Sequence, residues 1–206
     1  MRGLFVTFEG IDRSGKTTQA RMLLDALGDE AVGVREPGGT AAGERIRALL
    51  KDPDVGLSAE AEALLFAAAR AELVAGVIRP ALETGRVVVS DRFLDSSLAY
   101  QGAARGLGVE QVERINSFAT GALRPDLTLL LDIDTAAASR RGAVEDDRFE
   151  QEGVTLQEQV AAAYDELAAA DPARWRRIAA DRDPSAVHED VLAAVTAARK
   201  APAGGR

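Results

Sequence analysis

Eight residues near the start of the chain restrict its fold more than any other feature. Gly10, Gly15, Lys16 and Thr17 stand at the spacing G-x-x-x-x-G-K-[ST], the pattern of a phosphate-binding loop. The glycines let backbone N–H groups face phosphate oxygens, the lysine reaches the outer phosphates, and the hydroxyl after it can bind Mg²⁺. The pattern predicts a site for a nucleoside triphosphate with magnesium.

A functional loop of this kind follows a strand and opens a helix, and the flanking residues have both patterns. Residues 4–8 form a short apolar run with the length of a buried strand. Apolar residues then recur at helical spacing over residues 20–27, and Gly28 is suited to end that helix. The other interpretation, a glycine-rich surface turn, is disfavoured because Lys16 is one of only three lysines in the chain.

Composition limits the class of protein. The chain has 206 residues, 47% of them hydrophobic, which suits one globular domain. It has no cysteine, so disulfides and thiol chemistry are excluded. Its net charge of −8 argues against a polynucleotide partner, because nucleic-acid surfaces are basic. No apolar run approaches the roughly 18 residues of a membrane span, and no signal-peptide pattern precedes the first strand. We therefore expect a cytoplasmic protein without a membrane partner.

Strand and helix patterns alternate along the chain. The strand-like runs are residues 4–8, 32–35, 87–90, 127–133 and 175–180. The helical patterns are residues 16–27, 40–51, 58–78, 95–103, 110–120, 135–141, 154–170 and 184–199. This alternation predicts an α/β fold, a five-stranded parallel sheet with helices on both faces. Pro80 is expected to break or kink the third helix. We expect a single domain over residues 1–200, a mobile lid loop at about 142–153 and a disordered tail at 201–206.

Charged side chains gather where the strand-like runs end. Ligands of an open parallel sheet bind beyond the carboxyl ends of its strands. Asp91, which follows three valines, is placed to bind magnesium or its waters together with Thr17. Arg35 and Arg92, at neighbouring strand ends, can each make paired hydrogen bonds to a phosphate. Two such arginines predict a second anionic substrate besides the triphosphate.

The chemistry expected at this site needs no general base. A monophosphate ester carries nearly two negative charges at pH 7, so its oxygen is already a nucleophile. The single histidine, His188, is expected on the surface of the last helix. Catalysis would then rest on positioning and on electrostatic stabilisation, to which Lys16, Arg13 and Arg92 contribute.

Water must be kept from the triphosphate during transfer. Residues 142–153 are polar, charged and bounded by glycines. This segment is predicted to close over the phosphates, with Arg148 inserted and Arg141 at its hinge. A solvated connector is the alternative that the sequence leaves open.

Together these stretches resemble the thymidylate kinases, P-loop enzymes of the nucleoside monophosphate kinase group that make dTDP from dTMP and ATP on the routes to dTTP. The resemblance is closest to the bacterial branch and extends in order from residue 4 to about residue 165. The matching segments are residues 9–19, 35–40, 65–70, 91–102, 124–128 and 148–150. The resemblance implies the P-loop NTPase fold, ATP and Mg²⁺ as co-substrate and cofactor, and a homodimer.

The resemblance also implies roles in recognising the base. Phe66 would stack on thymine, and Arg70 would donate to its O4. These two residues are one helical turn apart, so both can reach one ligand. Ser97 and Gln101 lie where the family reads the base edge, and Tyr100 lies where it crowds the ribose 2′ position.

Further implied contacts concern the sugar and the phosphates. Asp12 corresponds to the residue that binds the sugar 3′-hydroxyl, and Arg35 and Arg92 to those that hold the dTMP phosphate. The implied ATP site comprises Gly10, Ile11, Asp12, Arg13, Ser14, Gly15, Lys16, Thr17, Thr18 and Arg141. Family members carry a basic residue either in the loop or in the lid, whereas this chain has both. We favour Arg13 for the transferred phosphoryl group, with Arg148 assisting.

Two other functions remain open on sequence alone. Another monophosphate kinase, or a deoxynucleoside kinase, would share the loop; the latter has a hydroxyl acceptor and would need a base, for which Glu9 is the candidate. A nucleotide-dependent switch would carry an Asn-Lys-x-Asp motif, and the sequence has none. The isomer of the Glu36–Pro37 peptide is left to the structure.

Overall fold

A parallel five-stranded sheet with the strand order β2–β3–β1–β4–β5 forms the centre of the molecule. The computed structural model describes residues 2–142 and 153–200. The strands are β1 (Phe5–Glu9), β2 (Ala31–Arg35), β3 (Val87–Asp91), β4 (Leu127–Asp132) and β5 (Trp175–Ala179). All five predicted strands are confirmed, and each of their ends lies within one residue of its expected position.

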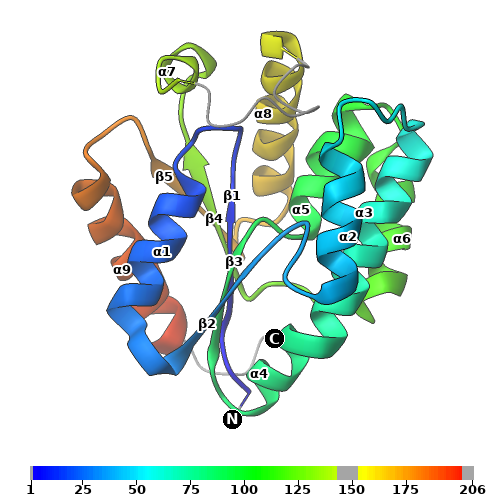
Figure 1. Ribbon diagram of the computed structural model, residues 1–206. Helices are drawn as coiled ribbons and strands as arrows, with labels where there is room; N and C mark the ends of the chain where they lie inside the picture. The colour runs from blue at the N-terminus through cyan, green and yellow to red at the C-terminus, as the bar shows by residue number, and fades with distance from the viewer. Residues whose placement is uncertain (1, 143–152, 201–206) are drawn as a thin grey trace.

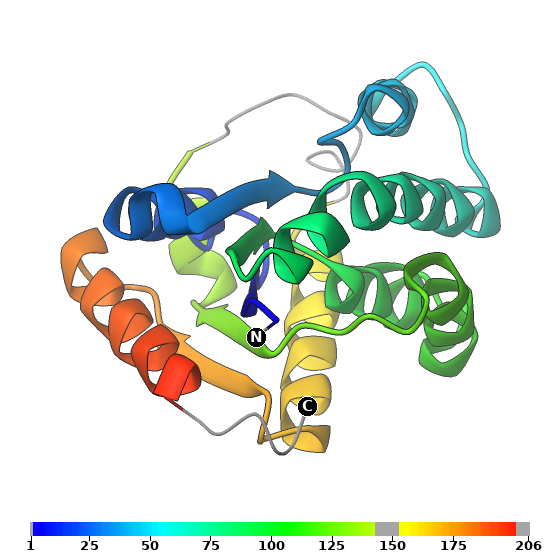
Figure 2. The same cartoon turned by 90° about the horizontal axis from the view of Figure 1, so that it is seen from below.

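Helices connect the strands and cover both faces of the sheet. They are α1 (Lys16–Leu27), the 3-10 turn η1 (Gly28–Glu30), α2 (Ala41–Lys51), α3 (Ala59–Leu73), the π-helical turn η2 (Val74–Ile78), α4 (Arg79–Glu83), α5 (Leu94–Ser97), the π-helical turn η3 (Leu98–Ala104), α6 (Val109–Thr120), α7 (Thr135–Ser139), α8 (Gly153–Ala170) and α9 (Pro184–Lys200). In Figure 1, α1 and α9 lie on one side of the sheet, and α3, α5 and α8 lie on the other. Figure 2 shows the same two layers from the end at which the strands begin.

The third predicted helix differs from expectation. Pro80 was expected to break or kink this helix. Helical structure continues from α3 through η2 into α4, so a break does not occur. Pro80 lies in the first turn of α4, inside the continuous helical segment, where it lacks the backbone N–H that other residues donate to the preceding turn. The π-helical turn η2 directly precedes it. Of the predicted lid, only Gly142 and Gly153 are among the described residues, and the predicted tail lies outside them.

The three central strands of the sheet, β3, β1 and β4, are buried on both faces. Along β1, Val6 and Phe8 belong to one hydrophobic cluster, whereas Phe5 belongs to the cluster on the other side. β3 repeats this alternation. Strands covered on both faces carry nearly continuous apolar runs, and each fully buried large side chain contributes roughly 1.5–3 kcal/mol. The sheet therefore forms a rigid base for the loops at its carboxyl end.

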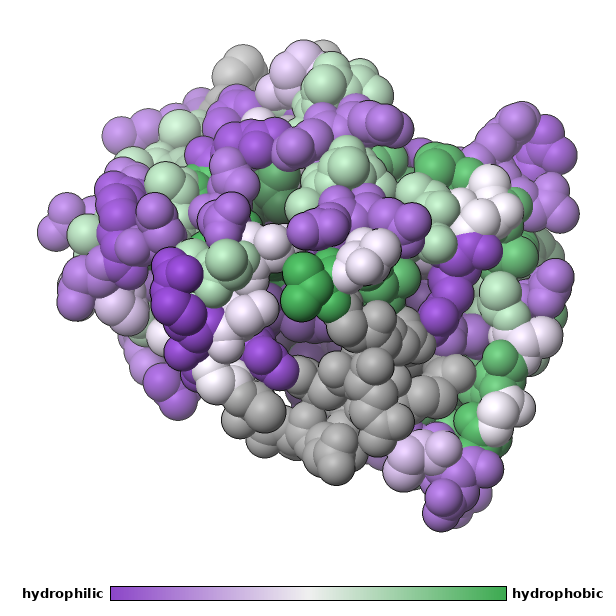
Figure 3. All heavy atoms as spheres, turned by 90° about the horizontal axis from the view of Figure 1, so that it is seen from above, coloured by the Kyte–Doolittle hydropathy of each residue, from purple (hydrophilic) through white to green (hydrophobic). Residues whose placement is uncertain are grey.

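A cavity lies where the chain changes direction around β1. After β3 the chain passes over β1 to reach β4, which is the kind of switch point at which α/β folds bind ligands. The cavity has a volume of about 910 Å³ and is lined by the loops after β1, β2 and β3 and by residues of α3 and η3. Figure 3 views this end of the molecule and shows a hollow among mainly hydrophilic side chains.

The helices in the described part of the chain differ from membrane-spanning segments. None of them combines the length and the low charge content that crossing a bilayer requires.

Candidate active site

The loop after β1 has a conformation that its glycines make possible. Gly10 and Gly15 have φ angles of 138° and 102°. A Cβ atom on Gly10 would lie 2.7 Å from the carbonyl oxygen of Leu131 and 2.9 Å from Oγ of Ser14, so a larger residue does not fit. Helix α1 begins directly after the loop. Its N-terminus adds a positive dipole to the loop's N–H groups, which favours an anion.

Lys16 is folded against this loop. Its Nζ donates to the carbonyl oxygens of Ile11 at 2.7 Å and Gly10 at 3.1 Å and to Oγ of Ser14 at 3.3 Å. Burial, together with the positive charge of Arg92, lowers the pKa of Lys16 to about 8. All three oxygens are neutral, so the ammonium group would form stronger hydrogen bonds with negatively charged phosphate oxygens.

Two oxygen-bearing side chains meet at the start of α1. Oγ1 of Thr17 donates to Oδ2 of Asp91 at 2.5 Å. The strands hold this pair in place, because β3 aligns Asp91 with Phe8 of the neighbouring β1. Mg²⁺ prefers oxygen ligands and binds phosphate sites through one or two carboxylates, with waters and phosphates completing its shell. A hydroxyl and a carboxylate in contact beside a phosphate-binding loop fit that requirement.

Arg92 links the loop to the rest of the cavity wall. Its guanidinium pairs with Asp12, donates to Oγ of Ser96 at 3.0 Å, and lies over the ring of Tyr100 with Cζ 5.1 Å from the ring centroid. Its backbone has a φ of 69°. Left-handed backbone is uncommon outside glycine and tends to occur at functional sites. The conformation holds a cation beside Asp12 at the cavity.

Asp12 is also tied to α8, far away in the sequence. Its backbone N–H donates to Oε1 of Gln157 at 3.0 Å, and Nε2 of Gln157 donates to Oδ2 of Asp12 at 2.7 Å. Burial raises the pKa of Asp12, but the positive charges of Arg92 and Lys16 outweigh it and hold that pKa below its usual value. Asp12 is thus an ionised acceptor fixed from three sides.

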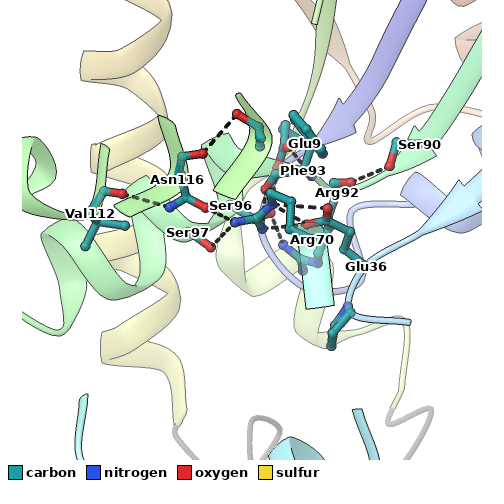
Figure 4. Close-up of polar contacts among 12 residues, drawn as sticks. Glu9, Glu36, Arg70, Ser90, Arg92, Phe93, Ser96, Ser97, Val112 and Asn116 are labelled. Carbon is teal, nitrogen blue, oxygen red and sulfur yellow. Dashed lines mark hydrogen bonds and ion pairs between the residues drawn. The ribbon is translucent and has the colours of Figure 1, made fainter. Parts of the chain in front are cut away.

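Arg70 lies in a dense polar network at one end of the cavity (Figure 4). Its Nε and one terminal nitrogen bond Glu36, and its other donors reach Oγ of Ser97 at 3.1 Å, Oδ1 of Asn116 and the carbonyl oxygen of Phe93 at 3.2 Å. A guanidinium has five N–H groups, and each of them has a partner here. To donate to a ligand, Arg70 must share or exchange one of these bonds.

Arg35 reaches the cavity from the end of β2. Its guanidinium donates to both carboxylate oxygens of Glu44 at 3.1 Å and to the carbonyl oxygen of Pro37 at 3.3 Å. The backbone N–H of Gly39 and the charge of Arg35 lower the pKa of Glu44. The peptide between Glu36 and Pro37 is cis. Arg35 is half exposed, so an incoming phosphate can compete with Glu44 for it.

Glu9 lies beneath the cavity, at the end of β1. It is fully buried and accepts hydrogen bonds from the backbone N–H of Phe93 at 2.8 Å, Oγ of Ser96 at 2.6 Å and the hydroxyl of Tyr164 at 2.9 Å. Figure 4 shows it beside Phe93 and Ser96. Burial and the nearby Asp95 raise the pKa of Glu9 to about 7. Its carboxyl does not reach the cavity wall formed by the described residues, which disfavours the base that a hydroxyl acceptor would need.

The comparisons with known proteins identify the family. The family model for thymidylate kinases matches residues 8–191. The chain belongs to the thymidylate kinase family. The thymidylate kinase of Desulforudis audaxviator is 48% identical, over 96% of this chain and 92% of the relative. That of Halorhodospira halophila is 49% identical, over 100% of this chain and 98% of the relative.

A solved structure agrees with this assignment. The thymidylate kinase of Ehrlichia chaffeensis superposes with a TM-score of 0.80 at 32% identity, over 95% of this chain and all of that chain. The family and the P-loop NTPase fold predicted from the sequence are both confirmed. The lid and the individual site residues remain predictions.

The structure brings most of the predicted site residues to one cavity. The predicted residues that line it are Asp12, Arg13, Ser14, Gly15, Lys16, Thr17, Thr18, Arg35, Phe66, Arg70, Asp91, Arg92, Ser97, Tyr100, Gln101 and Arg141. Gly10 and Ile11 do not line the cavity, and their carbonyl oxygens accept hydrogen bonds from Lys16. Arg141 donates to the carbonyl oxygens of Arg13 at 3.0 Å and Ser14 at 3.1 Å. Arg148 lies outside the described residues.

Several residues that line or support the site were not predicted from the sequence. Arg47 and Lys51 line the cavity from α2, and Arg182 and Val187 line it beyond β5. Arg182 and Val187 could have been predicted, because both follow β5 and ligands of a parallel sheet bind beyond the carboxyl ends of its strands. No local signal marks Gln157, because its partner is 145 residues away. His188, expected on the surface, is half-buried on α9.

Proposed function

We propose that the chain transfers the γ-phosphoryl group of ATP to dTMP, forming dTDP and ADP. One observation carries this proposal: a continuous cavity joins the phosphate-binding loop at Lys16 to Arg92 and then to the pocket around Phe66 and Arg70. Two nucleotides that bind at its two ends would have their phosphates adjacent near Arg92. Membership of the thymidylate kinase family supports dTMP as the acceptor.

The transfer needs no proton acceptor. A dTMP phosphate oxygen, ionised at neutral pH, attacks the γ-phosphorus, and the bond from that phosphorus to the β–γ bridging oxygen breaks as ADP leaves. The transition state is loose, so positioning and electrostatic stabilisation supply most of the catalysis. Lys16 and Arg13 would neutralise charge on the triphosphate, with Arg148 assisting, while Arg35 and Arg92 hold the acceptor phosphate.

Thr17 and Asp91 would hold Mg²⁺ when the nucleotide binds. Their hydroxyl and carboxylate oxygens are in contact beside the loop, and they are the donor types that this ion prefers. Mg²⁺ neutralises charge on the β- and γ-phosphates. Asp91 therefore belongs to the catalytic groups, and turnover should cease when the metal is chelated.

The contacts with the two nucleotides follow from the lining of the cavity. Phe66 would stack on thymine, Arg70 would donate to O4 by exchanging one of its present bonds, and Asp12 would accept from the 3′-hydroxyl. Ser97 and Gln101 would meet the base edge, and Tyr100 would crowd the 2′ position. The ATP phosphates would be contacted by Arg141 and by the remaining loop residues Ser14, Gly15 and Thr18. Gly10 and Ile11 would support Lys16.

We further propose a homodimer that acts in the cytoplasm. Helices α3 and α6 pack side by side, and each exposes a large apolar side chain. Leu64 on α3 is 57% exposed and Phe118 on α6 is 92% exposed. Apolar side chains at this exposure support a contact surface for a second copy.

The test is an acceptor panel. ADP release is measured with ATP, Mg²⁺ and each of dTMP, dUMP, UMP, CMP, dGMP and AMP, with thymidine as a hydroxyl acceptor. The highest kcat/KM is expected for dTMP, and no turnover is expected with thymidine. A different best acceptor, or phosphorylation of thymidine, would reject the proposal.

A further inference from the structure

The amide of Gln101 is held at one end by a buried carboxylate. Its Nε2 lies 2.8 Å from Oε1 of Glu62, and the two residues are 2% and 1% exposed. A carboxylate accepts hydrogen bonds and has none to donate. Gln101 must therefore turn its NH₂ group towards Glu62, and a flipped amide would oppose two acceptors. The carbonyl oxygen, Oε1, is left on the opposite side.

Glu62 is itself held in one orientation. Arg105 donates from Nε to Oε1 at 3.1 Å and from its terminal nitrogen to Oε2 at 3.0 Å. Two parallel bonds of this kind fix the plane of a carboxylate, and the ion pair compensates its buried charge. Glu62 comes from α3, Gln101 from η3, and Arg105 directly follows η3. The trio therefore joins two elements that line the cavity.

Oε1 of Gln101 is an acceptor on the cavity side. Within residues 2–142 and 153–200 no group donates to it, and Gln101 lines the cavity near Phe66 and Ser97. A pyrimidine with a hydrogen at N3 can donate to such an oxygen. A pyrimidine with a lone pair at N3 would place two acceptors face to face, and an unpaired buried acceptor is costly.

We infer that Glu62, oriented by Arg105, is a positioning residue that fixes the Gln101 amide with its carbonyl oxygen towards the base. It thereby selects an acceptor nucleotide whose pyrimidine has a hydrogen at N3. Glu62 does not touch the base and acts only through Gln101. This inference rests on the proposed function, since it concerns how the acceptor base is chosen.

The test compares dTMP with 5-methyl-dCMP, which differs from it only in having an amino group at position 4 and a lone pair at N3. The kcat/KM of both is measured for the wild type and for Glu62→Gln. The new amide can donate as well as accept, so it removes the penalty against a flipped Gln101. We expect the ratio of kcat/KM for dTMP over 5-methyl-dCMP to fall about tenfold, which is the size of one hydrogen bond. The loss should appear as a higher KM for dTMP, with kcat changed less than about twofold.

Two further variants complete the design. Glu60→Gln removes the same charge from an exposed position in the first turn of the same helix, and it should leave the ratio unchanged. If Glu62→Gln fails to fold because Arg105 loses its partner, the double variant Glu62→Gln with Arg105→Gln removes both charges together. It should show the same fall in the ratio.

The outcomes separate the inference from the proposed function. A folded Glu62→Gln or double variant with the wild-type ratio would overturn the role of Glu62 while leaving dTMP phosphorylation intact. A wild type that uses 5-methyl-dCMP as well as dTMP would overturn the orientation of Gln101. A wild type that phosphorylates neither nucleotide would reject the proposed function, and this inference with it.

Discussion

Glu9 directly precedes the phosphate-binding loop and Lys16 lies within it. Burial shifts the pKa values of these two residues in opposite directions. Burial and Arg92 lower the pKa of Lys16 to about 8. Burial and Asp95 raise the pKa of Glu9 to about 7. In both cases burial stabilises the neutral form relative to the charged form, because a low-dielectric environment disfavours charge. Both groups therefore titrate near neutral pH, where small changes in their surroundings matter.

At Lys16, we predict that ATP binding takes up protons near pH 8. Phosphate oxygens favour the charged ammonium, so binding raises the pKa of Lys16 and about half a proton is taken up at pH 8. For the same reason, ATP affinity should fall by up to tenfold per pH unit above about pH 8. Calorimetric titration with Mg-ATP in buffers of different ionisation enthalpy measures the uptake. Lys16→Arg, whose guanidinium stays charged, should lose this uptake, and an equal uptake in both proteins would contradict the prediction.

At Glu9, we predict a stability that declines as pH rises. The pKa of Glu9 is about 7 in the folded protein against an ordinary 4.5, so the folded state binds this proton more tightly. The contribution is fully present below about pH 4.5 and is lost as pH passes about 7, with a total of ~3 kcal/mol in the free energy of unfolding. Glu9→Gln, which resembles the protonated form, should lack this decline. Urea unfolding across that pH range measures it, and parallel curves for the two proteins would contradict it.

Ion pairs that connect different helices and strands differ in how deeply they are buried. Arg174, which precedes β5, donates to the two carboxylate oxygens of Asp95 on α5 at 2.5 and 3.1 Å and to Oγ1 of Thr128 on β4 at 2.6 Å. Asp95 is fully buried. Arg177 of β5 pairs with Asp132, but both side chains are nearly half exposed. Of these two pairs, only Arg174–Asp95 would leave a buried charge if its arginine were replaced.

For this element pair, we predict that Arg174→Met destabilises the protein by about 3–5 kcal/mol, because Asp95 would remain as a buried charge without its partner. The matched change Arg177→Met should cost no more than about 1 kcal/mol, since exposed pairs are weak. Urea unfolding at neutral pH measures both. Adding Asp95→Asn to Arg174→Met should recover part of the loss. Equal costs for the two single changes would show that burial does not decide the strength of the pair.

For the whole molecule, the surface of α3 and α6 leads to a prediction about assembly. We expect the wild type to have twice the chain mass of 21.7 kDa in light scattering. Phe118→Ser should weaken the dimer at least about tenfold, because exposed aromatic side chains dominate interfaces. Val154→Ser changes another exposed apolar side chain, 55% exposed and on α8, and should leave the mass unchanged. A monomeric wild type would reject the proposed dimer.

Local patterns were sufficient to predict the five strands, most helices and the phosphate-binding loop. Strand periodicity and apolar runs depend on neighbouring residues, so β1 and β3 were found with nearly correct ends. The continuation of the helix past Pro80 was missed, because a proline inside a helical pattern normally breaks or kinks the helix. The motif, the strand-end charges and the resemblance to the family together predicted the sixteen residues that line one cavity in the structure, but they gave no information on the partners of those residues.

The sequence by itself determined the loop from Gly10 to Thr17, because its chemistry depends on the backbone conformation of consecutive residues. Only the tertiary structure decided how the surrounding side chains are oriented and charged. Arg70 bonds Glu36, 34 residues away, and Gln101 bonds Glu62, 39 residues away. Hydrogen-bond direction and burial are set by elements that meet through packing, and no spacing along the chain encodes them. The loop therefore predicts a phosphate site, and we propose that the packed network around it selects the nucleotide.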